Sequence, residues 1–268
     1  MLTSMKHRLV LWAKRLLYSR RGEPYKIRGF ILRYVPGSRP VRVAYKNSAN
    51  SNTRYDALQV ELFSSGLQPG DTAIDIGAHH GQYCILMAAA CGGAGHVVAF
   101  EPDPYAREVL SRNLALNPSL KRPRVEPVAL SNADGEATLY SRGGNSQSSL
   151  ARSGAEFSAE QHAESIRVQT MQLDTYLAQN NLPTPKWVKI DAEGAEIQIL
   201  QGARDLLGGP TRFVCELHPY AWPEFGNNYT ELRELVAQAG RRMHYLGSEE
   251  QMPTVAVYGT VLIEPFEP

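Results

Sequence analysis

The 268-residue chain has few cysteines and no long hydrophobic run. Its three cysteines, Cys84, Cys91 and Cys215, are odd in number and lack the paired spacing of disulfide frameworks and zinc sites. We therefore expect them to be reduced, buried and inert, in a cytoplasmic protein. The apolar stretch at 9–13 is interrupted by Lys14 and Arg15, so it is too short for a membrane span or a secretory signal core. Internal repeats and long low-complexity tracts are also absent.

Hydrophobic residues make up 43% of the chain and charged residues 21%, as in ordinary globular proteins. The length suits one large α/β domain, or one domain with a small appendage. The net charge of +1 conceals an asymmetry, because 13 of the 28 lysines and arginines, but only one acid, lie in residues 1–54. We expect a basic arm or cap over residues 1–55 and a larger domain over residues 56–268.

A basic segment of this kind suits an anionic partner, which could be a phosphate-bearing substrate, a membrane surface or nucleic acid. The alternative is that the arm lies against its own acidic domain. Residues 1–21 contain a short basic amphipathic pattern that predicts a helix either packed on the domain or lying on a membrane. We expect Arg39 and Arg42 to contribute to binding of an anionic acceptor. Nucleic acid is disfavoured because no recognised RNA-binding module is present.

From residue 71 onward, short β-branched runs alternate with helical patterns, which predicts a parallel sheet covered by helices. Asp103 and Pro104 supply an N-cap and a first-turn proline for one of these helices. Strands are expected at 72–77, 96–102, 124–130, 135–142, 186–191 and 212–219, with two closing strands in 254–265 bent at Gly259. Helices are expected at 82–91, 105–116, 195–207 and 230–240.

The sequence "TAIDIGAHHGQY" predicts a nucleotide-binding turn between the first strand and its helix. Gly77 permits a tight turn, and Gly81 permits a ligand to approach the helix N-terminus. Glu101 ends the next strand, where a carboxylate can accept hydrogen bonds from ribose hydroxyls. A dinucleotide pyrophosphate favours Gly-x-Gly-x-x-Gly, and the middle glycine is missing here. The turn therefore favours S-adenosylmethionine (SAM) over a nicotinamide dinucleotide, with Asp75 placed to meet the ammonium group of the methionine part.

A second group of acids follows the strand at 186–191, in "KIDAEGAE". Asp191 and Glu193 are expected at the carboxyl edge of the sheet, where such folds bind ligands. Glu196 is interpreted as a first-turn helix acid that interacts with the helix dipole. Glu216 and His218, in "CELHP", repeat the arrangement one strand further along.

His79 and His80 are adjacent, and adjacent side chains project in different directions, so the two are not expected to chelate one metal ion. No partner with ligand spacing lies nearby except Cys84, which an apolar helix should bury. We expect one imidazole to point toward the methionine part of the cofactor and the other to pack or cap locally.

Taken in order, "DIGAHHGQY", "AFEPDP", "VALSNADGEATLY", "SSL", "LDTYL", "VKIDAEGAE", "LQGA" and "CELHP" resemble the FkbM-type methyltransferase family over about residues 56–220. The resemblance implies a class I, Rossmann-like methyltransferase fold, with a seven-stranded, mostly parallel sheet, an antiparallel last strand and helices on both faces. It also implies SAM-dependent methyl transfer to a hydroxyl of a sugar, a glycan or a secondary metabolite. The chain departs from the family at His79 and His80, where Asn and a small apolar residue are common.

Carried over by position, the cofactor site comprises Asp75, Gly77, Ala78, Gly81, Tyr83, Glu101, Pro102, Ser131 and Asp191. Within this set, the loop at Leu130 and Ser131 would border the adenine, and Asp191 would lie near the methyl group.

An alcohol acceptor must lose its proton, so the acceptor side requires a general base or a metal ion. Asp191, Glu193 and His218 are the predicted catalytic residues, and His218 is the best base by its intrinsic pKa. An equal alternative is that His218 is an ordinary loop residue before Pro219. A magnesium ion held by Asp191, Glu193 or Glu216 is compatible with the sequence but not required by it.

Two other functions compete with methyl transfer. One is a degenerate methyltransferase fold that binds an anionic partner or a membrane through its basic arm. The other is a nicotinamide-dependent oxidoreductase, which the missing glycine disfavours.

Overall fold

The computed structural model describes residues 12–38, 51–141, 143, 148–151, 164–248 and 252–266. Arg39 and Arg42, which were predicted to contact an anionic acceptor, lie outside the described residues.

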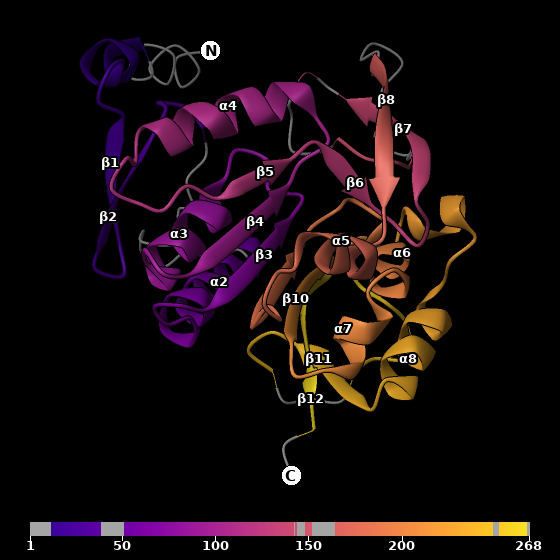
Figure 1. Cartoon of the computed structure of the whole chain (residues 1–268). Coiled ribbons are helices and arrows are strands. Elements are labelled where there is room, and N and C mark those ends of the chain that lie inside the picture. Colours follow the sequence, from indigo (N-terminus) through magenta and orange to yellow (C-terminus); the bar gives the residue numbers. More distant parts are fainter. Residues whose placement is uncertain are drawn as a thin grey trace.

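A seven-stranded sheet forms the centre of the molecule (Figure 1). Its order is β11-β12-β10-β9-β3-β4-β5. The last strand, β12, runs antiparallel to β10 and β11, while β10, β9, β3, β4 and β5 pair in parallel. The predicted class I methyltransferase fold is therefore confirmed. The strands are β3 (Thr72–Ile76), β4 (His96–Phe100), β5 (Arg124–Glu126), β9 (Trp187–Ile190), β10 (Arg212–Leu217), β11 (Arg241–Tyr245) and β12 (Gly259–Pro265).

Helices cover both faces of this sheet, because alternate residues of each buried strand point to opposite sides. Ala73 of β3 joins one core with α2, α3 and α4, whereas its neighbour Ile74 joins the other core with α5, α6, α7 and α8. The helices of the first face are α2 (Ser51–Gly66), α3 (Gln82–Cys91) and α4 (Pro104–Ala115). Those of the second face are α5 (Leu173–Asn180), α6 (Glu196–Gln201), α7 (Arg204–Gly208) and α8 (Tyr229–Gln238).

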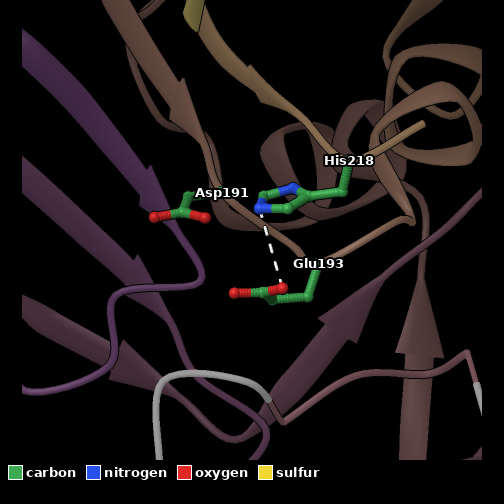
Figure 2. Close-up of side chains that lie close together, drawn as sticks. All are labelled: Asp191, Glu193 and His218. Carbon is green, nitrogen blue, oxygen red and sulfur yellow. Dashed lines mark ion pairs between the residues drawn. The ribbon is translucent and has the colours of Figure 1, made fainter. Parts of the chain in front are cut away.

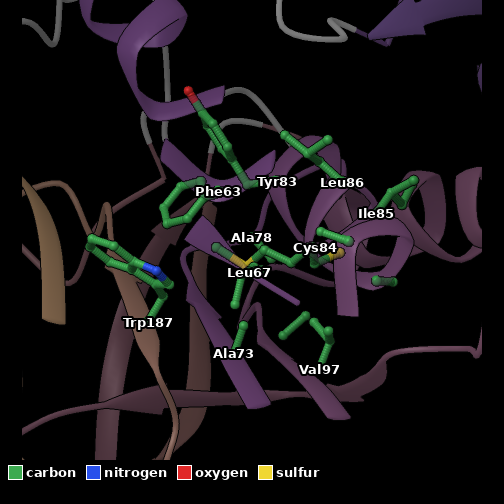
Figure 3. Packing of buried hydrophobic residues seen from close by; sticks show 14 of the residues in the cluster. Phe63, Leu67, Ala73, Ala78, Tyr83, Cys84, Ile85, Leu86, Val97 and Trp187 are labelled. Carbon is green, nitrogen blue, oxygen red and sulfur yellow. The ribbon is translucent and has the colours of Figure 1, made fainter. Parts of the chain in front are cut away.

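The first core centres on α3, which is apolar around its whole circumference and is accordingly buried between α2 and the sheet (Figure 3). Phe63 contacts the rings of Tyr83 and Trp187 edge-on, with centroid separations of 5.8 and 6.0 Å. Edge-to-face pairs of this kind add about 0.5–1.5 kcal/mol to the burial term. Cys84, Cys91 and Cys215 are free and buried, as predicted.

Three segments differ from the sequence expectations. The strand predicted at 124–130 divides at Pro127, which cannot donate a ladder hydrogen bond. Its first part is β5. Its second part, β6 (Val128–Leu130), pairs with β8 (Glu164–Met171), which also pairs with β7 (Gly135–Ser141). The helix predicted at 195–207 divides at Gly202 into α6 and α7. A Cβ at Gly202 would lie 2.1 Å from the carbonyl oxygen of Ser131, so the two segments approach too closely for a side chain.

The third difference is at the C-terminal edge. The two closing strands predicted in 254–265 are wrong, since only β12 forms there and it pairs with β11. Strand β11 was not predicted because its sequence, "RRMHY", is rich in basic residues, yet its first residue, Arg241, is buried. Its guanidinium donates to the carbonyl oxygens of Leu207 and Thr211, both at 2.6 Å.

The described N-terminal residues form a short helix at 12–18 and a hairpin of β1 (Glu23–Ile27) and β2 (Phe30–Tyr34). The hairpin is fixed to α4, since Asn113 accepts from the amide of Val35 at 2.7 Å and Asn117 from that of Arg33 at 2.9 Å. In the helix at 12–18, by contrast, the large apolar side chains are exposed to solvent.

Helix α2 begins before residue 56, and the predicted division of the chain into an arm and a domain at that point stays a prediction. Among the described residues, no helix combines the length and apolarity that crossing a membrane requires.

Candidate functional site

The predicted site residues gather where β3, β4, β9 and β10 end. Because these strands are parallel, the segments that follow them meet at one edge of the sheet. The β3 and β4 ends carry the glycine turn, Asp75 and Glu101. The β9 and β10 ends carry a second cluster of acids with His218. We describe the two groups in turn.

The turn after β3 fits between the ends of its neighbouring strands. Gly77 has φ 73°, and a Cβ there would lie 1.8 Å from the carbonyl oxygen of Asp191, beyond β9. The amides of Gly77 and Ala78 both donate to the carbonyl of Phe100, at 3.0 and 3.1 Å. Gly77 is thus required by backbone approach as well as by its dihedral angles.

The structure shows a side-chain contact that requires a glycine at position 81. Its φ is 83°, and a Cβ would lie 2.1 Å from Cδ1 of Leu110. The space beside Gly81 is therefore filled by α4. The glycine allows α3 to begin directly against α4, and the approach of a ligand at this position stays a prediction.

Asp75 is a buried carboxylate without a conventional partner. Its exposure is 1%, and neither oxygen makes a hydrogen bond with the described part of the chain. Burial raises the pKa of Asp75 to about 6, and the Lys189 charge offsets this only in part. Unsatisfied buried groups of this kind cost about 1–3 kcal/mol, so Asp75 fits a ligand that brings a cation or a donor.

Glu101 follows β4 and closes against the glycine turn. One carboxylate oxygen accepts from the amide of His79 at 2.6 Å, and the other from the amide of Asp103 at 2.9 Å. Burial raises the pKa of Glu101 to about 7, despite these two hydrogen bonds. Each oxygen retains a lone pair for a further donor such as a hydroxyl group.

The two histidines of the turn do not diverge as predicted. Their rings are stacked, with centroids 3.6 Å apart and an interplanar angle of 21°. The reason is that His79 has a left-handed backbone conformation, with φ 48°. The side-chain directions of a helix or a strand therefore do not apply to it. Asn113 of α4 donates to the carbonyl of His80 at 2.8 Å and so fixes this end of the turn.

Asp191, Glu193 and His218 converge from the loops after β9 and β10 (Figure 2). One potential ligand atom from each lies within 4.8 Å of the other two. His218 Nε2 is 3.6 Å from Glu193 and 4.0 Å from Glu216. The hydroxyl of Tyr220 donates to Glu193 at 2.8 Å. The sequence-predicted catalytic residues are therefore brought together, with Glu216 beside them.

Glu196 lies in the first turn of α6, as predicted, but its side chain has contacts that the sequence did not indicate. Its side chain is fully buried, and its carboxylate lies 2.9 Å from Nδ1 of His218. The Trp222 indole donates to the other oxygen at 2.7 Å, and the Gly194 amide donates to the first at 2.7 Å. The sequence carried one signal of this role, a single acid at the start of the apolar sequence "EIQIL". A carboxylate that is buried among apolar residues requires hydrogen-bond partners.

The charges of the cluster are strongly coupled. Burial alone would raise the pKa of Asp191, but Lys189, which donates to it at 3.0 Å, lowers it below the ordinary value. Burial raises the pKa values of Glu193 and Glu216 to about 7. Burial alone would lower the pKa of His218, but the hydrogen bond and charge of Glu196 raise it to about 10. The predicted role of His218 as a base stays a prediction.

Two neighbouring serines connect the two halves of the site. Ser148 donates to Asp103 at 2.7 Å, and Ser149 donates to the carbonyl of Glu193 at 2.6 Å. Asp103 also accepts from Ser141 at 2.6 Å. Although burial alone would raise the pKa of Asp103, these hydrogen bonds lower it.

Three predicted cofactor residues have other contacts in the structure. The Tyr83 hydroxyl donates to Asp56 at 2.8 Å, and its ring lies 4.8 Å from Lys189 Nζ. The carbonyl of Pro102 accepts from Arg107 at 2.6 Å. Ser131 lies against Gly202, and its amide donates to Met171. Their cofactor contacts stay predictions.

Sequence comparison identifies proteins that are related to this chain. A hexuronic acid methyltransferase, AglP, from Haloferax volcanii is 24% identical over 59% of this chain and 61% of its own length. The methyltransferase sdnD from Sordaria araneosa is 28% identical over 48% of this chain and 59% of its own length. The chain thus spans about three fifths of the curated relatives that it matches.

One solved structure similar to this chain is methyltransferase FkbM from Methylobacillus flagellatus KT. The match covers 83% of this chain and 56% of that protein, with 14% identity and a TM-score of 0.47. The family profile described as "Methyltransferase FkbM domain" matches residues 75–243, from Asp75 in β3 to Met243 in β11. This match includes both halves of the site. The chain therefore belongs to the FkbM methyltransferase family.

Proposed function

We propose that the protein is a SAM-dependent O-methyltransferase that acts on a hydroxyl of a sugar, a glycan or a secondary metabolite. The observation that carries the proposal is the pairing of two sites at one sheet edge. Buried acids flank a glycine turn at β3 and β4, and an acid–histidine cluster follows β9 and β10. Family membership supports the reaction class. The name of AglP, a hexuronic acid methyltransferase, supports a sugar acceptor.

The residues of the first half fit SAM. Asp75 offers two unsatisfied carboxylate oxygens to an ammonium group, and Glu101 offers free lone pairs to ribose hydroxyls. Gly77 and Ala78 hold the turn between them, and we place Pro102 and Ser131 at the nucleoside end. When bound, SAM supplies a methyl group on a positively charged sulfur. The protein holds the acceptor in line with that group and excludes water.

The second half handles the proton of the acceptor hydroxyl. Glu193 and Glu216, with pKa values raised to about 7, are partly ionised near neutral pH and can accept a proton there. Lys189 keeps Asp191 ionised beside them, near the predicted methyl position. His218 faces these carboxylates with Nε2, and Glu196 fixes its ring.

Isothermal titration with SAM and with its demethylated product tests the proposal. We expect binding to the wild-type protein and a loss of at least tenfold in affinity for both Asp75→Asn and Glu101→Gln. Asp134→Asn, an exposed acid in the loop before β7, is the matched control. A thermal shift with a nicotinamide dinucleotide but not with SAM would favour the oxidoreductase alternative. Mass spectrometry of sugars and metabolites from cells with and without the protein then identifies the methylated acceptor.

We also propose that the N-terminal helix contacts an anionic membrane surface. Trp12, Leu16 and Leu17 are 62%, 61% and 75% exposed, and Ile31 of the hairpin is 67% exposed. Basic residues 14, 15, 20 and 21 lie beside them. Exposed apolar side chains combined with positive charge fit an interfacial helix, and they do not support packing on the domain.

Vesicle sedimentation tests this contact. The wild-type protein should sediment with phosphatidylserine-containing vesicles more than with phosphatidylcholine vesicles, and Leu16→Ser with Leu17→Ser should abolish the difference. Val255→Ser, which changes a residue that is 70% exposed elsewhere, is the control. Equal sedimentation of all three proteins would contradict the proposal.

A further inference from the structure

We infer that Asp191, Glu193 and His218 form a binding site for one divalent transition-metal ion, with Glu196 orienting the histidine ligand. Binding of the ion follows from these residues alone. Only its role in the reaction rests on the proposed methyl transfer.

The geometry of the three groups suits a shared ion. One ligand atom from each lies within 4.8 Å of the others, and His218 Nε2 is 3.6 Å from Glu193. Ligand atoms around a cation with bonds of about 2.1 Å are separated by roughly 3–4 Å. Small side-chain adjustments therefore complete the site. Asp191 and Glu193 are 30% and 17% exposed, so one side stays open to water or to an acceptor oxygen.

The contacts of Glu196 define the form of His218 that binds a metal. The Trp222 indole and the Gly194 amide can only donate, so both Glu196 oxygens act as acceptors. The His218 Nδ1 therefore carries the hydrogen that Glu196 accepts at 2.9 Å, and Nε2 faces the acids. A histidine whose second nitrogen donates to a buried carboxylate is the usual arrangement of a metal-binding imidazole.

The balance of charge also favours a cation. His218 Nε2 lies 3.6 Å from Glu193 and 4.0 Å from Glu216, and Asp191 has a carboxylate oxygen within 4.8 Å of the group. Glu196 contacts Nδ1 on the other side of the ring. Lys189 is the lysine in contact with this group, and it is already bonded to Asp191. The hydroxyls of Tyr220 and Tyr258 donate to Glu193 and Glu216 and hold these carboxylates in place. A divalent ion would offset the remaining negative charge.

The ligand types indicate the class of ion. Imidazole favours transition metals, and carboxylates favour harder cations, so the combination suits Mn²⁺ or Zn²⁺ better than the magnesium considered from sequence. In the proposed reaction the ion would hold the acceptor oxygen and lower the pKa of its hydroxyl. The O–H bond breaks and its proton passes to Glu216. The same oxygen forms a bond to the methyl carbon as the bond from that carbon to sulfur breaks.

The experiment uses the full chain after dialysis against a chelator, titrated with MnCl₂ and followed by electron paramagnetic resonance and calorimetry. We expect one Mn²⁺ per chain. Binding should be lost in His218→Ala and in Asp191→Asn, and it should weaken 10–100-fold in Glu196→Gln, which changes a residue behind the ligand. The control is His244→Gln, because His244 lies 3.3 Å from Glu264 in a second acid–histidine pair on β11 and β12. Far-ultraviolet circular dichroism and a cooperative urea transition show that each variant has folded.

Failure of Mn²⁺ and Zn²⁺ to bind the wild-type chain, or equal binding by His218→Ala, would overturn the site. Full turnover of a methylated acceptor in excess chelator would overturn the catalytic role while leaving methyl transfer intact. Metal binding by a protein that does not bind SAM would instead contradict the proposed function alone.

Discussion

Replacement of Gly77 by alanine tests how closely the glycine turn and the β9 loop approach. Two costs add at this position. The first is the positive φ of 73°, which costs about 1–2 kcal/mol for an L-residue. The second is the contact of 1.8 Å between the new Cβ and the carbonyl oxygen of Asp191. A backbone oxygen cannot rotate away, so the strands must separate, at a further cost of about 1–3 kcal/mol. We expect a total loss of about 2–5 kcal/mol.

Gly226→Ala is the matched control, because Gly226 has φ 70° and no atom within 4 Å of a built Cβ. It should lose only the dihedral cost of about 1–2 kcal/mol. The assay is urea denaturation of both variants, with unchanged m-values as the condition for comparing free energies of unfolding. Affinity for SAM, measured by titration, should fall in Gly77→Ala and stay constant in Gly226→Ala. Equal destabilisation of the two variants would refute the close approach.

Three further perturbations test the fold and its charges. Burial raises the pKa of Glu101 in the folded protein to about 7. Its contribution to the free energy of unfolding is therefore complete below about pH 4.5 and is lost as the pH rises through 7. Urea denaturation should measure this loss as about 3 kcal/mol. Glu101→Gln should remove that part of the pH slope, whereas exposed Glu108→Gln should retain it. Asp103→Ala should cost about 2–3 kcal/mol, because it removes an N-cap and the acceptor of Ser141 and Ser148; Asn228→Ala, which removes only a cap, should cost about 1 kcal/mol by the same assay. Phe63→Ala should cost about 3–5 kcal/mol by thermal and urea unfolding, and a loss below 1 kcal/mol would contradict the packing around Tyr83 and Trp187.

The sequence predicted the features that depend on local pattern. The β-branched runs of β3, β4, β9 and β10 identified the parallel core. Their acids, Asp75, Glu101, Asp191 and Glu216, were therefore placed at one edge. These predictions rely on alternation and on parallel strand direction, which a single sequence carries.

The remaining features depend on contacts between distant segments. Nothing near Arg241 indicates that its guanidinium is satisfied by carbonyls about 30 residues away, so β11 was missed. The role of Glu196 requires His218 and Trp222, and the pKa of His218 depends in turn on the burial of Glu196. His79 was misjudged because its left-handed backbone is imposed by the turn and not by its own side chain.

The adjacent hydroxyls of Ser148 and Ser149 place one short segment in contact with both the α4 cap and the Glu193 carbonyl. A change in length between β7 and β8 would consequently shift the segment that follows β4 and the loop that follows β9 at the same time.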